Sequence, residues 1–246
     1  MTPKWLSRYE FKQHKWIFVP TPESVVEGTK IKSELTKRWS IPSFYFHLRN
    51  GGHVGALREH LDNKYFLRVD IQNFFSSISR GRVTRCLKPL VGYLNAREFA
   101  HLSTVRSPIN HSTIIPFGFI QSQIIASICL QGSALGVYLE KLHRDPSITV
   151  TVYVDDLIIS AKDEDLLQSV WIELLEKATK SQFTFNQSKS HAPAEEISAF
   201  NIILRNGSLK IDDRRLDLFR HEIAGGSPEK IAGISSYIRS VNPDQL

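Results

Sequence analysis

Two adjacent acids in an apolar stretch are the residues of this sequence best suited to chemistry. Asp155 and Asp156 lie within TVTVYVDDLIISA (149–161), whose β-rich runs on either side predict a hairpin. Two like charges side by side cost free energy unless a cation lies between or beside them. Aspartate is also common in turns because it hydrogen-bonds the backbone, so the pair alone leaves a structural role open.

A third acid strengthens the case for a metal site. Asp70 follows the strand-like run YFLRVDI (65–71) and precedes Phe74 and Phe75, so it lies at the end of a predicted strand. Three aspartates on two strand features can hold two Mg²⁺ ions, which take oxygen ligands and keep positions for phosphate. Two such ions activate a hydroxyl and stabilise departing pyrophosphate in an in-line displacement. The three acids therefore predict two-metal nucleotidyl transfer.

Mixed helices and strands must position these acids. Apolar alternation predicts strands, and amphipathic spacing together with the start signal at Pro22 predicts helices. The predicted strands cover 15–20, 65–71, the hairpin 149–161 and two short runs in 196–211 around Asn206-Gly207, and the predicted helices cover 25–39, 80–90, 96–102, 121–143 and 163–182. This order favours an α+β fold over a doubly wound parallel sheet.

Composition excludes several classes of protein. Two cysteines cannot form a disulfide framework, and no Cys/His cluster indicates zinc. The charged N-terminus contains no apolar leader, and polar residues interrupt the span-length segment 119–139, which we expect to be a buried helix. We therefore expect a cytoplasmic protein with no membrane partner.

The positive charge is concentrated in the first part of the chain. Residues 1–68 hold 12 Lys and Arg against 6 Asp and Glu, and three of the four tryptophans. A basic, aromatic-rich module is typical of nucleic-acid binding, although a solvated lysine face over an aromatic core gives the same composition.

Five tracts resemble the reverse transcriptases and occur in that family's order. They are FLRVDIQNFFSSI (66–78), PFGFIQSQ (116–123), YVDD (153–156), FNQSK (185–189) and FNIIL (200–204). Taken singly, each has an ordinary interpretation as core phenylalanines, a turn or an exposed lysine. Taken together they identify the chain as similar to a bacterial reverse transcriptase of the retron-like or defence-associated group. The resemblance implies a right-hand polymerase palm and fingers with a minimal thumb.

The resemblance also implies roles for single residues. Those that would bind the two Mg²⁺ ions are Asp70, Asp155, Asp156 and, through its carbonyl, Ile71, while Lys189 would protonate departing pyrophosphate. Nucleotide contacts are implied for Lys15, Phe75, Phe117, Gly118 and Tyr153, and a primer grip for Phe200, Asn201 and Ile202. The bulky ring of Phe75 would exclude a ribose 2′-hydroxyl and so select dNTPs. Arg49 and Arg68 join Lys15 as candidates for template and triphosphate contacts.

Departures from the family pattern affect template handling and the thumb. Phe117 stands where the family's loop has Gln, Gln123 stands where it has Pro, and Asn201 replaces part of a Leu-Gly pair. About 35 residues follow the predicted primer grip, and the Val-Thr-Gly signature of retron thumbs is missing. We expect fingers at 1–68, palm at 69–215 and a truncated thumb at 216–246.

The implied function is RNA-directed DNA synthesis from dNTPs, with an associated non-coding RNA as template and a role in anti-phage defence. Phe117 and the short thumb keep open a template-independent or protein-primed DNA synthase. A protein of another class, an inactive palm-fold scaffold that binds RNA, is also compatible with the basic module. A partner subunit or a second copy of the chain could supply the missing thumb surface.

Overall fold

The computed structural model describes residues 3–12 and 15–246, which fall into two compact units. The first unit contains the chain up to residue 42 together with 71–140 and 177–184. The second contains 43–70, 141–176 and 185–246. Each unit is therefore assembled from segments that are distant in the sequence.

The second unit is built on a four-stranded antiparallel sheet. Its strand order is β6-β7-β3-β8, with bounds Ile148–Tyr153, Asp156–Ala161, Tyr65–Asp70 and His191–Ala194. The hairpin expected in 149–161 is present as β6 and β7, and the strand expected at 65–71 is β3. The sheet thus brings β3 beside β7, with the end of β3 against the start of β7.

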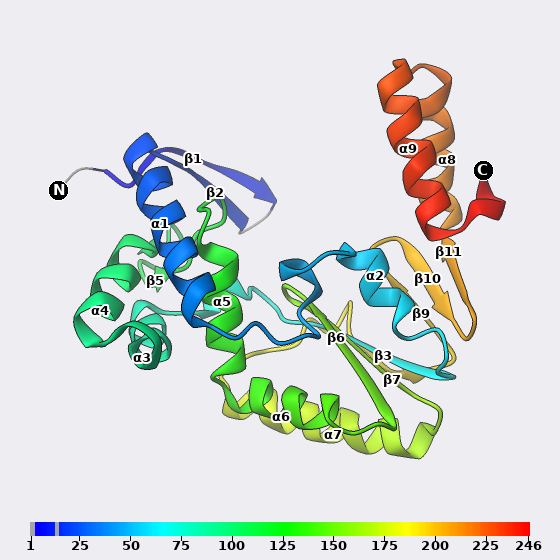
Figure 1. Ribbon diagram of the computed structural model, residues 1–246, viewed down its shortest axis with the longest axis horizontal. Coiled ribbons are helices and arrows are strands. Elements are labelled where there is room, and N and C mark those ends of the chain that lie inside the picture. Colours follow the sequence, from blue (N-terminus) through cyan, green and yellow to red (C-terminus); the bar gives the residue numbers. More distant parts are fainter. Residues whose placement is uncertain (1–2, 13–14) are drawn as a thin grey trace. The chain divides into compact units, whose positions relative to one another are not determined.

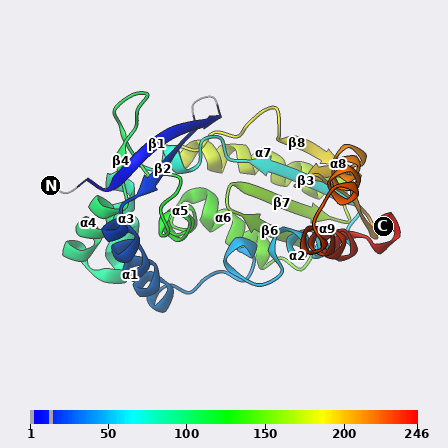
Figure 2. The ribbon, with the colours of Figure 1, turned by 90° about the horizontal axis from the view of Figure 1, so that it is seen from above.

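Helices and a second sheet cover this sheet (Figure 1). Helix α7 (Glu164–Lys180) runs along one face and buries Leu167, Val170 and Leu174 (Figure 2). A shared core joins Phe66 and Ile158 to α2 (Gly52–Arg58) and to a three-stranded meander with two helices. These elements are β9 (Glu196–Ala199), β10 (Ile202–Arg205), β11 (Ser208–Ile211), α8 (Asp213–Ala224) and α9 (Pro228–Val241). Short 3₁₀ helices cover Phe46–Leu48 and Pro243–Gln245.

The first unit combines a two-stranded hairpin with a helical cluster. Its elements are β1 (Trp5–Lys12), β2 (Lys15–Pro20), α1 (Pro22–Arg38), a 3₁₀ helix Phe75–Ser77, α3 (Arg80–Val91), α4 (Tyr93–Leu102), β4 (Val105–Arg106), β5 (Thr113–Ile114), α5 (Ser122–Gln131) and α6 (Ala134–His143). Helix α1 begins where its sequence predicts, because Thr21 Oγ1 accepts the Ser24 N–H at 3.2 Å and Pro22 needs no donor in the first turn. The α+β fold is confirmed.

The prediction of a single helix at 121–143 is wrong, because this segment forms two helices, α5 and α6. Gly132 ends α5, and the Ser133 hydroxyl accepts the Gly136 N–H at 3.1 Å, which caps a new helix. A Cβ on Gly136 would lie 2.0 Å from Leu130 O, so the corner requires glycine. In the part of the chain that the structure describes, no single helix is long and apolar enough to span a bilayer, and α5 with α6 reaches that length only as a pair bent by 79°.

Sequence reasoning also missed short elements. Strand β1 has almost every residue exposed and so shows no alternation, while β4, β5 and β8 are too short to give a periodic signal. Residues 196–211 form three strands rather than two, because Phe200-Asn201 makes an additional turn before the expected turn at Asn206-Gly207.

A buried histidine ties β6 to β7 beneath the sheet. His60 is fully buried, with Nδ1 2.6 Å from Ser160 Oγ and Nε2 2.8 Å from Thr151 Oγ1. Asn63 Nδ2 donates to the same Ser160 hydroxyl at 2.8 Å. Burial lowers the pKa of His60 to about 3, so the ring is neutral in the folded protein.

This pKa predicts acid-sensitive stability. In the unfolded chain His60 binds a proton below its ordinary pKa of 6.5. In the folded protein it stays neutral until the pH approaches about 3. The free energy of unfolding should therefore fall as pH decreases through this window. Urea denaturation at pH steps from about 6.5 to about 5 measures the slope. His60→Gln should give a shallower slope, and equal slopes would contradict the assignment.

Candidate functional site

Two predicted acids face each other across neighbouring strands of the second unit. Asp70 ends β3 and Asp156 begins β7, and the antiparallel register pairs them directly. Their side chains are 6% and 14% exposed. Directly opposed side chains have Cβ atoms about 4.5–5.5 Å apart, and like charges there destabilise the pair. The register therefore creates a buried negative site that needs compensating cations.

Two cations meet this need. Lys189 Nζ lies 2.8 Å from Asp70 Oδ2, so the predicted lysine does join the predicted acid. Arg68 donates to Asp156 Oδ1 from Nη2 at 2.8 Å and from Nε at 3.1 Å, and to Ser198 O at 2.6 Å. Arg68 precedes Asp70 by two residues in β3, so alternation puts both side chains on one face of the sheet.

The electrostatics of Asp156 show opposing effects. Burial raises the pKa of this carboxyl most, the Arg68 guanidinium lowers it, and the Asp70 charge raises it again. The net pKa is above the ordinary value of 3.8. Arg68 thus offsets only part of the cost of burying Asp156 as an anion.

Asp155 lies in the strained turn that joins β6 to β7. The turn has two residues, Val154 and Asp155, between the paired Tyr153 and Asp156. Val154 has φ of +60°, a conformation that a β-branched residue rarely adopts. Such strain persists only where the surroundings enforce it, and it clusters at functional sites.

His47 supports this turn, although no sequence signal singled it out. The Val154 N–H donates to His47 Nδ1 at 3.0 Å. The same Nδ1 is 3.5 Å from Val152 O, but a ring nitrogen cannot both donate and accept, and the amide is an obligatory donor. Burial lowers the pKa of His47 to about 4, which keeps the ring neutral and its Nδ1 lone pair available.

The donor set fits a hard divalent cation in part. Asp70 and Asp156 supply carboxylate oxygens from adjoining strands, the ligand type that Mg²⁺ prefers. Among the described residues, no three His, Cys, Asp or Glu side chains group closely enough to hold a metal ion. The opposed pair is thus the donor set that the structure provides, with Lys189 and Arg68 as its present counter-charges.

The predicted primer-grip residues meet the β6–β7 hairpin through aromatic rings. Phe200 and Asn201 form the turn between β9 and β10 with φ of +57° and +61°, and Ile202 is buried in the core. The Phe200 ring lies 5.2 Å from the ring of Tyr153. His53, which sequence reasoning missed, lies 5.3 Å from Phe200.

Beside this aromatic contact is a cavity of 500 Å³. It is lined by His53, Phe200 and Asn201 together with Arg215 and Phe219 of α8 and Gly233, Ile234 and Tyr237 of α9. His53 Nε2 is 3.0 Å from the Tyr237 hydroxyl. The turn Phe200-Asn201 therefore faces a hollow that α8 and α9 help to enclose.

The other predicted residues belong to the first unit. Phe75 and Phe117 are paired edge to face, with ring centroids 4.7 Å apart. Phe117 O accepts the Phe18 N–H at 2.9 Å, which holds the loop against β2. Gly118 has φ of +103°, and a Cβ there would lie 2.3 Å from Phe18 O. The close approach of loop and strand therefore requires glycine.

Each unit thus holds one part of the predicted site. The second unit gathers the acids with Lys189, Tyr153 and the primer-grip residues Phe200–Ile202. The first unit holds Lys15 in β2, the buried Ile71, and the pair Phe75 and Phe117 with Gly118. Of the two further basic candidates, Arg68 contacts Asp156, and Arg49 lies over the Phe46 ring at 4.6 Å.

Comparisons with known proteins agree with this geometry. The chain is 24% identical over 213 residues to the retron Mx65 reverse transcriptase of Myxococcus xanthus, covering 76% of this chain and 48% of that protein. It thus spans about half the length of this curated relative. The foamy viral protease-reverse transcriptase dRH, solved in complex with ds DNA, superposes with a TM-score of 0.50 at 14% identity, covering 93% of this chain and 34% of that one.

The likeness to the foamy viral structure shows a shared fold only, because the two chains are 14% identical. Residues 26–202 match the family described as reverse transcriptase (RNA-dependent DNA polymerase). This match takes in β3, the β6–β7 hairpin and the loop at 116–123. The chain therefore belongs to the reverse transcriptase family.

Proposed function

We propose that this protein is an RNA-directed DNA polymerase that adds dNTPs to a primer end by two-metal nucleotidyl transfer. The observation that carries the proposal is the opposed pair Asp70 and Asp156, each held by a cation, in a chain of the reverse transcriptase family. Such a pair has no evident structural benefit, since like charges in register destabilise a sheet. Its value lies in the negative site that it creates.

The chain's own residues prepare this site. Two Mg²⁺ ions, when bound by Asp70, Asp155, Asp156 and the Ile71 carbonyl, would lower the pKa of the attacking 3′-hydroxyl and neutralise the leaving pyrophosphate. Arg68 holds Asp156 in a fixed rotamer, and the ammonium of Lys189 carries a proton that it can give to departing pyrophosphate. Val154 and His47 fix the backbone from which Asp155 projects.

Nucleotide and primer contacts extend the proposal beyond the acids. Lys15, Phe117 and Gly118 would contact the incoming nucleotide with Tyr153, and Phe75 would act as the steric gate. Phe200, Asn201 and Ile202 would grip the primer. The 500 Å³ cavity that Phe200 and Asn201 line together with α8 and α9 would lie beside the gripped primer. We further propose fingers at 1–68, palm at 69–215 and thumb at 216–246. The end of the proposed fingers, residues 43–68, belongs to the same compact unit as the acids.

The likeness to a retron reverse transcriptase supports a proposal on the template and the biological setting. We propose a non-coding RNA template, cytoplasmic action and a role in anti-phage defence. Phe117 in place of the usual Gln keeps template-independent or protein-primed synthesis as the second candidate, because its ring packs on Phe75 and offers no amide to a template base. Sequencing the DNA made with co-purified RNA separates them: a complement of that RNA supports templating, and a homopolymer supports the rival.

Removal of one acid tests the metal assignment. Asp155→Asn should abolish dNTP incorporation in Mg²⁺ while the protein stays folded, because the substitution is nearly isosteric and the hydrogen bond from Val154 N–H to His47 remains. Primer extension measures incorporation, and circular dichroism checks the fold. EDTA should mimic the variant on the wild type. An Asp155→Asn protein that polymerises at the wild-type rate would refute the two-metal proposal.

The steric gate has its own test. Phe75→Val should raise rNTP incorporation relative to dNTP at least about tenfold, because a smaller side chain admits the 2′-hydroxyl. Competition between dNTP and rNTP in primer extension measures the ratio. The matched control is Phe74→Leu, which changes a buried neighbour that points into the core. An unchanged ratio in Phe75→Val, or the same change in both variants, would contradict the gate.

His47 should act as a positioning residue. His47→Phe leaves the Val154 N–H without its acceptor, which costs about 1–3 kcal/mol of unfolding free energy. Misplacement of Asp155 should lower kcat about tenfold with little change in the KM for dNTP. His47→Gln offers an acceptor oxygen and should recover much of kcat. Steady-state kinetics with urea denaturation tests this, and equal kcat in both variants would exclude a role through hydrogen bonding.

A further inference from the structure

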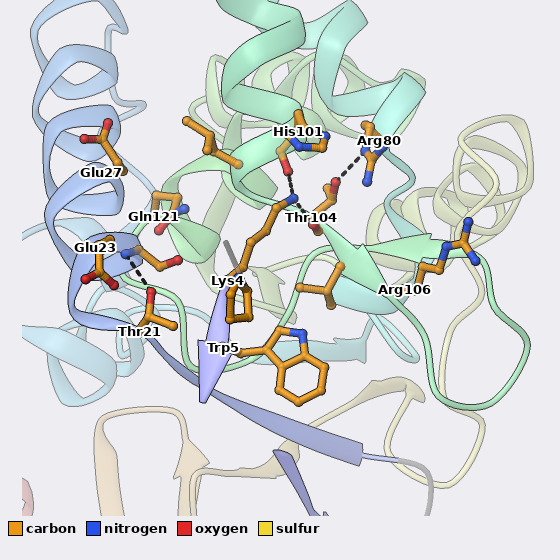
Figure 3. A pocket seen from close by; sticks show the side chains of 14 residues that line it. Lys4, Trp5, Thr21, Glu23, Glu27, Arg80, His101, Thr104, Arg106 and Gln121 are labelled. Atoms are coloured by element: carbon orange, nitrogen blue, oxygen red, sulfur yellow. Dashed lines mark hydrogen bonds between the residues drawn. The ribbon is translucent and has the colours of Figure 1, made fainter. Parts of the chain in front are cut away.

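A cavity of 560 Å³ in the first unit has no part in the proposed polymerase site (Figure 3). Its walls come from the residues around Lys4, from α1, from the start of α3, from the end of α4 with β4, and from Gln121. Ligand-binding cavities in proteins measure about 300–1,000 Å³. This one is therefore large enough for a ligand the size of a nucleotide.

One wall of the cavity is cationic. Arg80 and Arg106 lie on this side, opposite α1, and Lys4 reaches across toward His101 and Thr104 (Figure 3). Lys4 Nζ donates to the carbonyl oxygens of Thr104, at 3.0 Å, and of His101. Arg80 Nε donates to Thr104 Oγ1 at 2.8 Å. These bonds fix the positions of Lys4 and Arg80 through neutral acceptors, and neither side chain forms an ion pair with another residue that the structure describes.

The positive charges of Lys4 and Arg80 disfavour each other and the protonation of His101. Burial and the Arg80 charge lower the pKa of Lys4 to about 8. The Lys4 charge, followed by burial and Arg80, lowers the pKa of His101. An anion placed between Lys4 and Arg80 would relieve the repulsion and form charge-assisted hydrogen bonds with both, and Arg106 adds positive charge to the same side of the cavity.

The opposite wall offers hydrogen-bond acceptors. Glu23 and Glu27 project from α1, and Gln121 lies near them (Figure 3). Gln121 is 1% exposed, and its Oε1 has no hydrogen-bond partner among the residues that the structure describes. Its Nε2 donates to Ser103 Oγ at 3.2 Å. Gly28 makes room for Oε1, since a Cβ at that position would lie 2.3 Å from it.

A buried acceptor without a hydrogen-bond donor costs free energy, and a ligand N–H that donates to it would remove this cost. Trp5 adds an aromatic surface to the same cavity. Its ring meets Phe18 edge to face at 5.8 Å and is only partly buried. Indole faces are favourable platforms for nucleobases. The cavity thus combines a cationic wall, an acceptor wall and a stacking ring.

We propose that this cavity binds a nucleoside phosphate, with the phosphate at Arg80, Arg106 and Lys4. The base lies against Trp5 and directs its N–H groups to Gln121 and Glu23. A free nucleotide and the 5′-phosphorylated end of a nucleic-acid strand share this chemistry. The site is additional to the polymerase centre, because its lining includes none of the residues assigned there.

Calorimetric titration of the full chain tests the proposal. The titrations use Asp155→Asn in EDTA, so that metal-dependent binding at the polymerase centre does not contribute. GMP and AMP are the nucleotide probes, with guanosine and inorganic phosphate as the two halves of the ligand. At least one nucleotide should bind about tenfold or more tightly than either half, since phosphate and base contacts both contribute. Absence of nucleotide binding, or binding of phosphate as tight as that of the nucleotide, would overturn the proposal.

Variants then locate the binding. Arg106→Ala should weaken nucleotide binding about tenfold, since one charge-assisted contact is lost. Arg38→Ala is the control, an exposed arginine on α1 outside the cavity lining. Gln121→Leu should weaken binding of the better-bound nucleotide, and Ser103→Ala, which removes only the partner of Gln121 Nε2, is its structural control and should bind nearly as the wild type does. Equal affinities in all these proteins would place the nucleotide elsewhere and overturn the assignment.

Oligonucleotides distinguish the two sources of the ligand. Tight binding of GMP or AMP that depends on Arg106 indicates a free nucleotide. Preference for a 5′-phosphorylated over a 5′-hydroxyl oligonucleotide, with the same dependence, indicates a strand end. Equal affinity for both oligonucleotides without binding of a mononucleotide contradicts the proposal. Because the titrations contain EDTA and no dNTP, these results are independent of whether the polymerase proposal holds.

Discussion

The pairing of Asp70 with Asp156 is the interaction on which the rest of the second unit depends. A sheet that places two carboxylates opposite each other loses free energy at that pair, and nearby groups offset the loss. Arg68 does so from the same face of β3, and Lys189 from the loop before β8. A shift of one residue in the register would separate these four charges onto opposite faces. The register of β3 against β7 is therefore both a structural and a chemical constraint.

Three of the six described non-glycine residues with positive φ lie near the same place. Val154, Phe200 and Asn201 all have positive φ, and they lie in two turns joined by the contact between Tyr153 and Phe200. Asparagine tolerates this conformation, whereas valine and phenylalanine do so at a cost. The hydrogen bond to His47 and the aromatic packing hold these turns in place. The strain marks both turns as positions where side-chain direction matters more than local stability.

Sequence alone predicted the three acids, the β6–β7 hairpin and most long elements, because these carry local signals such as apolar alternation and capping residues, and the family resemblance added Lys189. It did not predict Arg68 as the partner of Asp156, since the two are separated by 88 positions and only the register brings them together. His47 was missed for the same reason. The break between α5 and α6 was missed because Gly132 and Ser133 act through caps, which a uniformly apolar stretch conceals.

The long separation between β3 and β7 also has a consequence for how the protein is made. On a ribosome, Asp70 is synthesised well before Asp156, and the loop that carries Lys189 follows later still. Closing so large a loop costs entropy that only the finished sheet repays. The hairpin and helices of the first unit are therefore synthesised before Lys189 is available to offset the charge of Asp70. The order of synthesis therefore places Lys189, and the meander whose residues share a core with Phe66, after both acids.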